Sequence, residues 1–262
     1  MTYFLDIECY RNYFLASFLR EDGVVKHFEL HNDCKLDIKG ISKILSKGLI
    51  ITFNGNHYDM PMLHLAMIGA DNNQLKTLSD SIINGAKTWG MDKPQCNHVD
   101  IKEPSPGVMT GLKTYGGRLK SEKLQDLPLS PDSLIKPEQR ELMRKYCVND
   151  LETTKQLYLA IEKDIVLRGQ LSEQYGVDVR SKSDAQIAEA VFKSYLTSQG
   201  VNVRKRSTEV KPFKYKVPEW LEFKSPVFVE MLERVKDCVF EVSEAGKPKM
   251  PAKISKAIQF DG

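Results

Sequence analysis

The feature that most constrains this chain is an apolar run at its N-terminus that carries two carboxylates. In Thr2–Cys9, Asp6 and Glu8 stand among aromatic and aliphatic side chains. Alternate side chains of a β-strand point to the same face, so a strand here sets both acids side by side, roughly 7 Å apart at Cα. Two negative charges in apolar surroundings are unfavourable unless a cation lies between them. The run therefore predicts an interior strand and a divalent metal ion site.

The composition allows one sizeable α/β domain with a smaller appendage. The chain has 262 residues, of which 41% are hydrophobic, and its net charge of +3 discriminates weakly between kinds of partner. The cysteines are odd in number and contain no C-x-x-C, which indicates reduced thiols and argues against a disulfide framework or a zinc site. No signal-peptide pattern and no apolar run of ~18 residues occurs. We therefore expect a soluble protein of the cytoplasm with no membrane partner.

The order of elements predicts a mixed sheet. Three β-rich stretches separated by short polar turns, Thr2–Cys9, Asn12–Leu19 and Val24–Leu30, predict an antiparallel meander. Helices and two further strands then alternate: helices at Leu36–Lys47, Met60–Gly69 and Leu75–Lys87, and strands at Leu49–Phe53 and Cys96–Ile101. This pattern is typical of an α/β fold in which helices flank a mixed five-stranded sheet.

The second half of the chain is predicted to be mostly helical. The expected helices are two short pieces, Gly111–Leu119 and Lys123–Leu127, a long stretch from Pro137 to about Arg168 with a break in it, and an amphipathic helix at Ser183–Ser198. The composition changes near Gly200, where a basic stretch begins. We expect a domain over residues 1–200 and a basic linker leading into a following module over residues 201–262.

A third acid lies in the turn between two predicted elements. Asp59 follows the short apolar strand Leu49–Phe53 and directly precedes the helix that begins at Met60. In open α/β sheets, sites form at the carboxyl ends of strands, which is where this turn lies. An ordinary helix N-cap is the alternative interpretation of Asp59.

A tyrosine and a fourth acid share one face of the long predicted helix. Tyr146 and Asp150 are four residues apart, so their side chains lie one helical turn apart and can point at the same target. The alternative for such a pair, taken alone, is a solvent-exposed contact on the helix surface.

In combination these patterns resemble a known family. The chain has D-x-E on its first strand, N-x-x-x-Y-D after a later strand, and Y-x-x-x-D on a late helix. Over residues 1–200 it resembles the DEDDy proofreading 3′–5′ exonucleases, which belong to the ribonuclease-H-like superfamily. The resemblance implies that Asp6, Glu8, Asp59 and Asp150 are the metal-site carboxylates and that Tyr146 holds the attacking water.

Further stretches narrow the resemblance. Gly111–Leu119, Leu124–Pro128 and Ser183–Glu189 resemble the exonuclease portion of bacteriophage-type DNA polymerases. The tail from about Val201 is similar to the segment that joins the proofreading and polymerising modules, and the catalytic aspartate motifs of the polymerase do not occur in this sequence. The resemblance implies a proofreading part of a DNA polymerase that acts in DNA replication, in the host cytoplasm if phage-encoded, with a polymerase module as partner in cis or in trans.

The resemblance also implies the cofactors and the substrate. Two Mg²⁺ ions are expected, for which Mn²⁺ should substitute; such ions lie about 3.5–4 Å apart in two-metal sites. Asp6, Glu8 and Asp150 are expected to hold the first ion, and Asp59 to support the second together with Asp6. The substrate is expected to be a single-stranded or frayed DNA 3′ end, bound mainly through stacking and backbone charge. Asn54 and Tyr58, which precede Asp59, are predicted to grip its last nucleotides.

Several other residues have both a functional and a structural interpretation. Lys113, Arg118 and Lys120 are possible phosphate contacts or ordinary surface charges, and His57 is expected to be incidental to the site. Asp100 could add an acid to the cleft, but a capping or turn role is favoured. The basic run Arg204–Lys216 could follow a DNA backbone or form a solvated linker face.

Two other functions remain alternatives at this point. One is a stand-alone exoribonuclease of the same fold, of the ribonuclease D type. The other is a catalytically inactive nucleic-acid-binding module. The clustered carboxylates argue against the second alternative, because negative charge does not help a protein that only binds a polyanion.

Overall fold

The computed structural model describes residues 1–107, 110–121, 123, 125–203, 211–243 and 247–255. The chain divides into two compact units, Met1–Asn202 and Val203–Gly262. The first unit contains the main sheet and all the predicted site residues.

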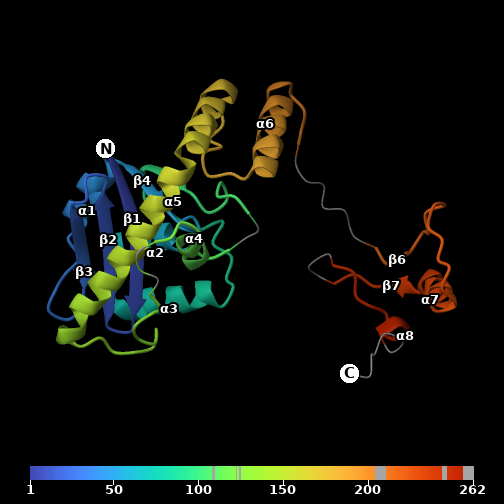
Figure 1. Cartoon of the computed structure of the whole chain (residues 1–262), viewed down its shortest axis with the longest axis horizontal. Helices are drawn as coiled ribbons and strands as arrows, with labels where there is room; N and C mark the ends of the chain where they lie inside the picture. The colour runs from blue at the N-terminus through green and yellow to red at the C-terminus, as the bar shows by residue number, and fades with distance from the viewer. Residues whose placement is uncertain (108–109, 122, 124, 204–210, 244–246, 256–262) are drawn as a thin grey trace. The chain divides into compact units, whose positions relative to one another are not determined.

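The first unit is built on a mixed five-stranded sheet (Figure 1). Its strands are β1 (Thr2–Tyr10), β2 (Tyr13–Arg20), β3 (Val25–Leu30), β4 (Leu49–Thr52) and β5 (Asn97–Asp100), in the spatial order β3-β2-β1-β4-β5. The first three strands form an antiparallel meander, and β4 and β5 run parallel to β1. The predicted fold class is confirmed: helices flank a mixed five-stranded α/β sheet, an arrangement consistent with the ribonuclease-H-like fold, and a small C-terminal unit follows.

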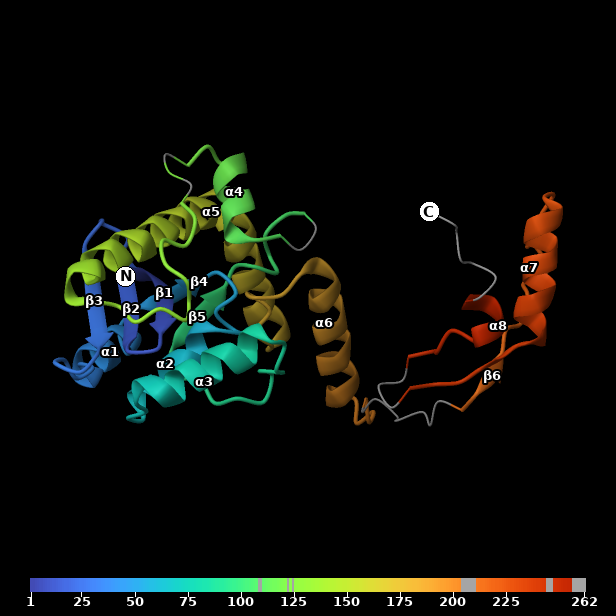
Figure 2. The ribbon, with the colours of Figure 1, turned by 90° about the horizontal axis from the view of Figure 1, so that it is seen from below.

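Helices cover both faces of this sheet (Figure 2). On one face, α1 (Ile38–Leu45), α2 (Asp59–Met67) and α3 (Asn72–Ile83) pack on Leu5 and Ile7 of β1. On the other face, α4 (Leu112–Arg118) and α5 (Arg140–Tyr175) pack on Phe4 and its neighbours. Because β1 is central and alternates its side chains, both of its faces are buried, which fixes the register of the acids it carries.

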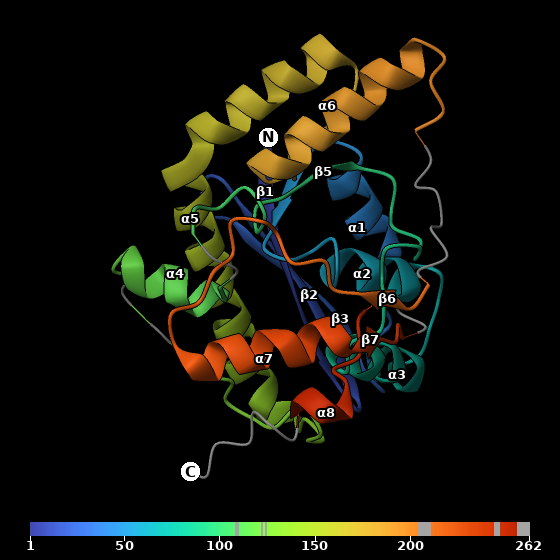
Figure 3. The ribbon, with the colours of Figure 1, turned by 90° about the vertical axis from the view of Figure 1, so that its right-hand side faces the viewer.

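Two predicted helical features are wrong in detail. The predicted break does not occur within α5: a 3₁₀ turn, Pro137–Gln139, leads into one helix that continues to Tyr175, and Figure 3 shows that its axis bends along the way. The helix ends at Gly176, whose φ of 64° places it in the left-handed region that glycine adopts easily.

The predicted helix Lys123–Leu127 is absent from the part of this segment that the structure describes. Pro128 disfavours the α conformation at Leu127, and the segment is too short to nucleate a helix alone.

The helix predicted at Ser183–Ser198 is confirmed as α6 (Asp184–Ser198), which lies beside the C-terminal part of α5 in Figures 1 and 3. The side chain of Gln186 accepts a hydrogen bond from the Ser183 backbone N–H at 3.1 Å, which satisfies one free donor at the helix start. On α6, the side chains of Phe192 and Tyr195 are exposed, at 67% and 62%, whereas Ile187 and Val191 are half-buried.

The second unit is small. It contains a two-stranded ribbon, β6 (Phe213–Lys214) and β7 (Val239–Phe240), and two helices, α7 (Pro226–Asp237) and α8 (Ala252–Ser255). The rings of Phe213 and Phe240 stack at 5.4 Å across the ribbon. Residues 204–210 of the basic run Arg204–Lys216 lie outside the described residues. No helix in the described part of the chain is long and apolar enough to cross a membrane.

Candidate functional site

Three of the predicted carboxylates meet between the sheet and α5. Asp6 and Glu8 lie on the face of β1 that α5 covers, and Asp150 approaches them from α5. One carboxylate oxygen from each of the three lies within 4.8 Å of the others. The Sγ of Cys147 donates to Asp6 Oδ2 at 3.1 Å, so the acid on β1 is also held by the helix. More than 140 positions separate Asp150 from the two acids of β1 in the sequence, and the fold brings them together.

The electrostatics of this cluster are unfavourable without an added cation. Burial raises the pKa of Asp6 to about 7, and the charge of Asp150 contributes to the shift. The pKa of Glu8 is raised by burial and then by the neighbouring acids, and the pKa of Asp59 is raised by burial and by Asp6. Burial also raises the pKa of Asp150, although hydrogen bonds from Tyr146 and Asn149 oppose the shift. A divalent cation would relieve this repulsion.

Asp59 approaches the same cluster from the opposite side of β1. It is the first residue of α2, is buried, and lies outside the group of three oxygens described above. A hydrogen bond from the backbone of Ile7, between the two acids of β1, lowers its pKa against the larger raising effect of burial. The N-cap of α2 is Tyr58, so the alternative in which Asp59 is an ordinary N-cap is wrong.

Tyr146 lies one turn before Asp150 on α5, and its side chain is buried. Burial raises the pKa of its hydroxyl, and the charges of Asp150, Glu8 and Asp6 raise it further. The hydroxyl therefore keeps its proton at neutral pH and can act as a hydrogen-bond donor beside the acids.

The two predicted nucleotide-gripping residues differ in their placement. Asn54 lines a hollow of about 430 Å³ together with Asp6 and Asp150, and its φ of 67° makes it the bend of the turn after β4. Tyr58 instead packs against the apolar core beneath α2, and its hydroxyl is hydrogen-bonded to Ser79 at 2.8 Å. The structure gives Tyr58 a packing role, and its placement does not support the predicted contact with substrate.

Asp100, for which a turn role was favoured, has that role. It ends β5 and is 4% exposed, and its two carboxylate oxygens accept the backbone N–H groups of Asn54 and Asn56, each at 2.8 Å. Sequence reasoning missed its neighbour Lys102, whose Nζ donates to Asn54 Oδ1 at 2.9 Å and which lines the same hollow as the acids. Lys102 follows β5 by two residues, and β5 ends beside β4. This position in the sequence could have indicated that Lys102 lies near the site.

The other basic candidates lie near the cleft without entering its carboxylate cluster. Lys113 on α4 forms an ion pair with exposed Asp126 at 3.0 Å, and its charge lowers the pKa of Glu8 against burial. Arg118 lies over the ring of Tyr115 at 5.7 Å, and Lys120 is exposed. The imidazole of His57 is within 3.0 Å of the Thr88 hydroxyl, which agrees with the structural interpretation.

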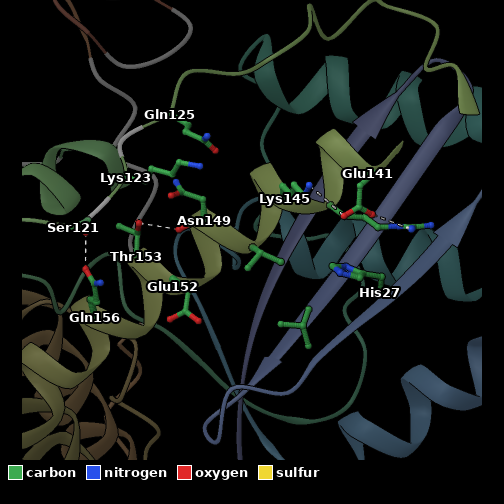
Figure 4. Close-up of a pocket in the computed structure, with 13 residues that line it drawn as sticks. His27, Ser121, Lys123, Gln125, Glu141, Lys145, Asn149, Glu152, Thr153 and Gln156 are labelled. Carbon is green, nitrogen blue, oxygen red and sulfur yellow. Dashed lines mark hydrogen bonds and ion pairs between the residues drawn. The ribbon is translucent and has the colours of Figure 1, made fainter. Parts of the chain in front are cut away.

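A second, larger hollow of about 910 Å³ lies along α5 and is also lined from β3 and from the segment that precedes α5 (Figure 4). Most of the residues that line it carry polar or charged side chains of both signs: Val25, His27, Ser121, Lys123, Gln125, Glu141, Arg144, Lys145, Val148, Asn149, Glu152, Thr153 and Gln156. None of the four predicted carboxylates lines it. The smaller hollow beside Asp6 and Asp150 is therefore the chemically distinctive one, despite its size.

No family model and no curated protein matches the chain. Among solved structures, the chain is similar to a family B DNA polymerase from the hyperthermophilic archaeon Pyrobaculum calidifontis, with a TM-score of 0.47 and 17% sequence identity. The match covers 83% of this chain and 30% of the polymerase chain, so this chain spans less than a third of that protein's length. A similarity this low does not assign an activity.

Proposed function

We propose that this chain is a metal-dependent 3′–5′ exonuclease that removes nucleotides from single-stranded or frayed DNA. The observation that carries the proposal is the convergence of Asp6, Glu8 and Asp150, whose carboxylate oxygens lie within 4.8 Å of one another. Within the described residues, no lysine or arginine forms an ion pair with any of these three acids. Carboxylates that repel one another and have no cationic side chain as a partner are suited to binding a metal cation.

The donor set fits hard divalent cations such as Mg²⁺ or Mn²⁺, because all its ligands are carboxylate oxygens. Asp6, Glu8 and Asp150 would hold one ion, and Asp59, which reaches β1 from α2, would support a second with Asp6. When bound, such ions neutralise charge on a phosphodiester and make a bound water acidic enough to attack at neutral pH.

The remaining residues would orient the reactants. The Tyr146 hydroxyl, which lies beside Asp150 and is kept protonated by its surroundings, would contact the attacking water and fix its direction. Asn54 lines the hollow beside Asp6 and Asp150 and would bind the terminal nucleotide. Because the acids are half-buried between β1 and α5, a paired terminus would have to fray before its last phosphodiester could reach them.

Nucleotide release from a 5′-labelled single-stranded DNA oligonucleotide tests the proposal. With Mg²⁺, the wild-type protein should produce a ladder that shortens from the 3′ end, and excess chelator should stop it. A circular single strand should stay intact, because it has no 3′ end. Cleavage of the circle, or no release of nucleotides with either Mg²⁺ or Mn²⁺, would overturn the proposal.

The same assay separates the alternatives. Faster degradation of a matched RNA oligonucleotide would favour a stand-alone exoribonuclease of the ribonuclease D type. Binding of single-stranded DNA without hydrolysis would favour an inactive binding module.

We further propose that the chain is the proofreading part of a bacteriophage-type DNA polymerase and works with a polymerase module, in cis or in trans, in the cytoplasm of the host cell. Support comes from the resemblance of Gly111–Leu119 and Ser183–Glu189 to such polymerases. Faster removal of a mispaired than of a paired 3′ terminus by this chain together with a polymerase would be the expected behaviour. Equal rates on both termini would contradict a proofreading role.

A further inference from the structure

We infer that Asp100 is a positioning residue of the acidic site: it fixes the turn after β4, which carries Asn54 and delivers Asp59 into the cleft. The inference rests on the proposed exonuclease function. It assigns to Asp100 no contact with metal or substrate, and it explains how the two chain segments at the carboxyl ends of β4 and β5 act as one unit.

Asp100 is placed to tie those two segments together. It pairs with Thr52 at the end of the parallel β4–β5 ladder, so its side chain lies beside the start of the turn. Its Oδ1 accepts the N–H of Asn54 and its Oδ2 accepts the N–H of Asn56, both at 2.8 Å. Since each oxygen is taken by a backbone donor, the carboxylate binds the turn at two points, as a bidentate clip.

The turn itself has little freedom once it is held there. Asn54 has a φ of 67°, which non-glycine residues seldom adopt, and its carbonyl accepts the N–H groups of His57 and Tyr58 at 3.0 and 3.2 Å. A Cβ at Gly55 would collide with the Thr52 side chain, so the backbone passes as close to β4 as a glycine allows. The two hydrogen bonds that Asp100 accepts from Asn54 and Asn56 hold the turn in this conformation.

The turn leads directly into α2, the helix that begins with the predicted metal ligand Asp59. The N–H of Met60 donates to the carbonyl of Gly55 at 2.9 Å, so α2 starts directly from the part of the turn that Asp100 holds. Asp59 is the first residue of that helix. A shift of the turn would therefore move Asp59 relative to Asp6.

Two lysines hold the side chains of the same turn. Lys102 Nζ donates to Asn54 Oδ1 and Lys93 Nζ donates to Asn56 Oδ1, each at 2.9 Å. The backbone N–H of Lys102 also donates to Asp100 Oδ1, at 3.1 Å. The clip thus sets the direction of the Asn54 amide as well as the position of Asp59.

The test compares Asp100→Ala and Asp100→Asn with the wild-type protein. We expect Asp100→Ala to raise the Mn²⁺ concentration that gives half-maximal binding, measured directly by electron paramagnetic resonance, by ~10-fold, as is typical when a supporting residue of a metal site is lost. The KM for a single-stranded 3′ end should rise as well. Asp100→Asn keeps one carbonyl oxygen as acceptor and should fall between the two.

A matched control separates positioning from general destabilisation. Asp37 also accepts a backbone N–H, that of Gly40 at 2.9 Å, but it caps α1 away from the turn. Asp37→Ala should lower the melting temperature and leave Mn²⁺ affinity and KM unchanged. If both alanine variants shift Mn²⁺ affinity equally, or if folded Asp100→Ala binds Mn²⁺ as the wild type does, the inference is wrong.

The remaining outcomes are also decisive. If Asp100→Ala does not fold, Asp100→Asn and Lys102→Met take its place in the test. The inference is overturned if Asp100→Asn binds Mn²⁺ with wild-type affinity and Lys102→Met has the wild-type KM. A wild-type protein that neither binds Mn²⁺ nor releases nucleotides overturns the proposed function, and the inference with it. An active wild type with unaffected Asp100 variants overturns the inference alone.

Discussion

The acidic cluster and the carboxylate of Glu29 lie on the same sheet but are stabilised in opposite ways. Glu29 on β3 accepts two hydrogen bonds from Arg144 of α5, from Nε at 2.9 Å and from Nη2 at 2.7 Å, and a third from Tyr13. Although burial acts to raise its pKa, the bonds from Arg144 and Tyr13 outweigh it, and the net shift is downward. Asp6 also contacts α5, through the Sγ of Cys147, but among the described residues no lysine or arginine forms an ion pair with it, and its pKa is raised to about 7.

The difference distinguishes two uses of a buried acid. At Glu29 the protein supplies its own counter-charge, so the charged pair helps to fasten α5 to the sheet. At the cluster no lysine or arginine of the described residues forms an ion pair with the acids, and the fold tolerates the repulsion between them. Removing an acid should therefore cost stability in the first region and activity in the second.

The largest expected effect is on activity in the cluster. Asp6→Asn or Asp150→Asn should lower Mg²⁺-dependent nucleotide release by ~10³-fold or more, as is common for groups at the centre of a catalytic site. Without metal, the free energy of unfolding should stay equal or rise, because a like charge is removed. Retained activity combined with a lower melting temperature would refute a metal-binding role for these acids.

The counterpart in the other region is Glu29→Gln. This change leaves Arg144 without its anionic partner and should lower the free energy of unfolding by about 1–3 kcal/mol. Denaturant titration of the metal-free protein measures this loss. Activity per folded molecule should remain within about twofold of wild type, since Glu29 lies outside the acidic cluster. A loss of activity as large as that of Asp6→Asn would show that the two regions do not differ in this way.

The two regions should also differ in their dependence on pH. Asp6 keeps its proton up to about pH 7 when folded but loses it near pH 4 when unfolded. Between these values the folded state binds more protons, so the free energy of unfolding of the metal-free protein should fall as the pH rises from 5 to 8, by ~2 kcal/mol.

Asp6→Asn should flatten this slope, and Mg²⁺ should restore stability at pH 8. The effect of Glu29 on stability has the opposite dependence on pH, because its pKa is lowered in the folded state. Its contribution to the free energy of unfolding is complete above the pKa of the unfolded state and decreases only in more acidic solution. A stability that rises between pH 5 and 8 in chelator would show that the cluster is not strained.

The smallest predicted effect sharpens the role of Tyr146 within the cluster. Tyr146→Phe keeps the ring in its buried place and removes the hydroxyl, so turnover should fall by about 10-fold. The Mg²⁺ concentration for half-maximal activity should be nearly unchanged, in contrast to the Asp6 variant. Unaltered turnover would remove Tyr146 from the proposed mechanism.

The clustering of Asp6, Glu8 and Asp150 could be predicted because these acids lie in patterns with a local cause. The alternation of a strand places Asp6 and Glu8 on one face, and the period of a helix places Tyr146 and Asp150 on another. The predicted helix at Lys123–Leu127 failed because a short weak pattern next to a proline carries little information about its tertiary surroundings.

The sequence by itself determined the order and type of the main elements and the residues whose chemistry stands out. Only the tertiary structure decided that Asp6, Glu8 and Asp150 share a space within 4.8 Å, that Tyr58 packs inward against Ser79, and that Asp100 holds the turn before α2. The reason is that periodicity is a local property of the chain. Which strand lies beside which, and therefore which side chains meet, depends on the burial of both faces of the sheet at once.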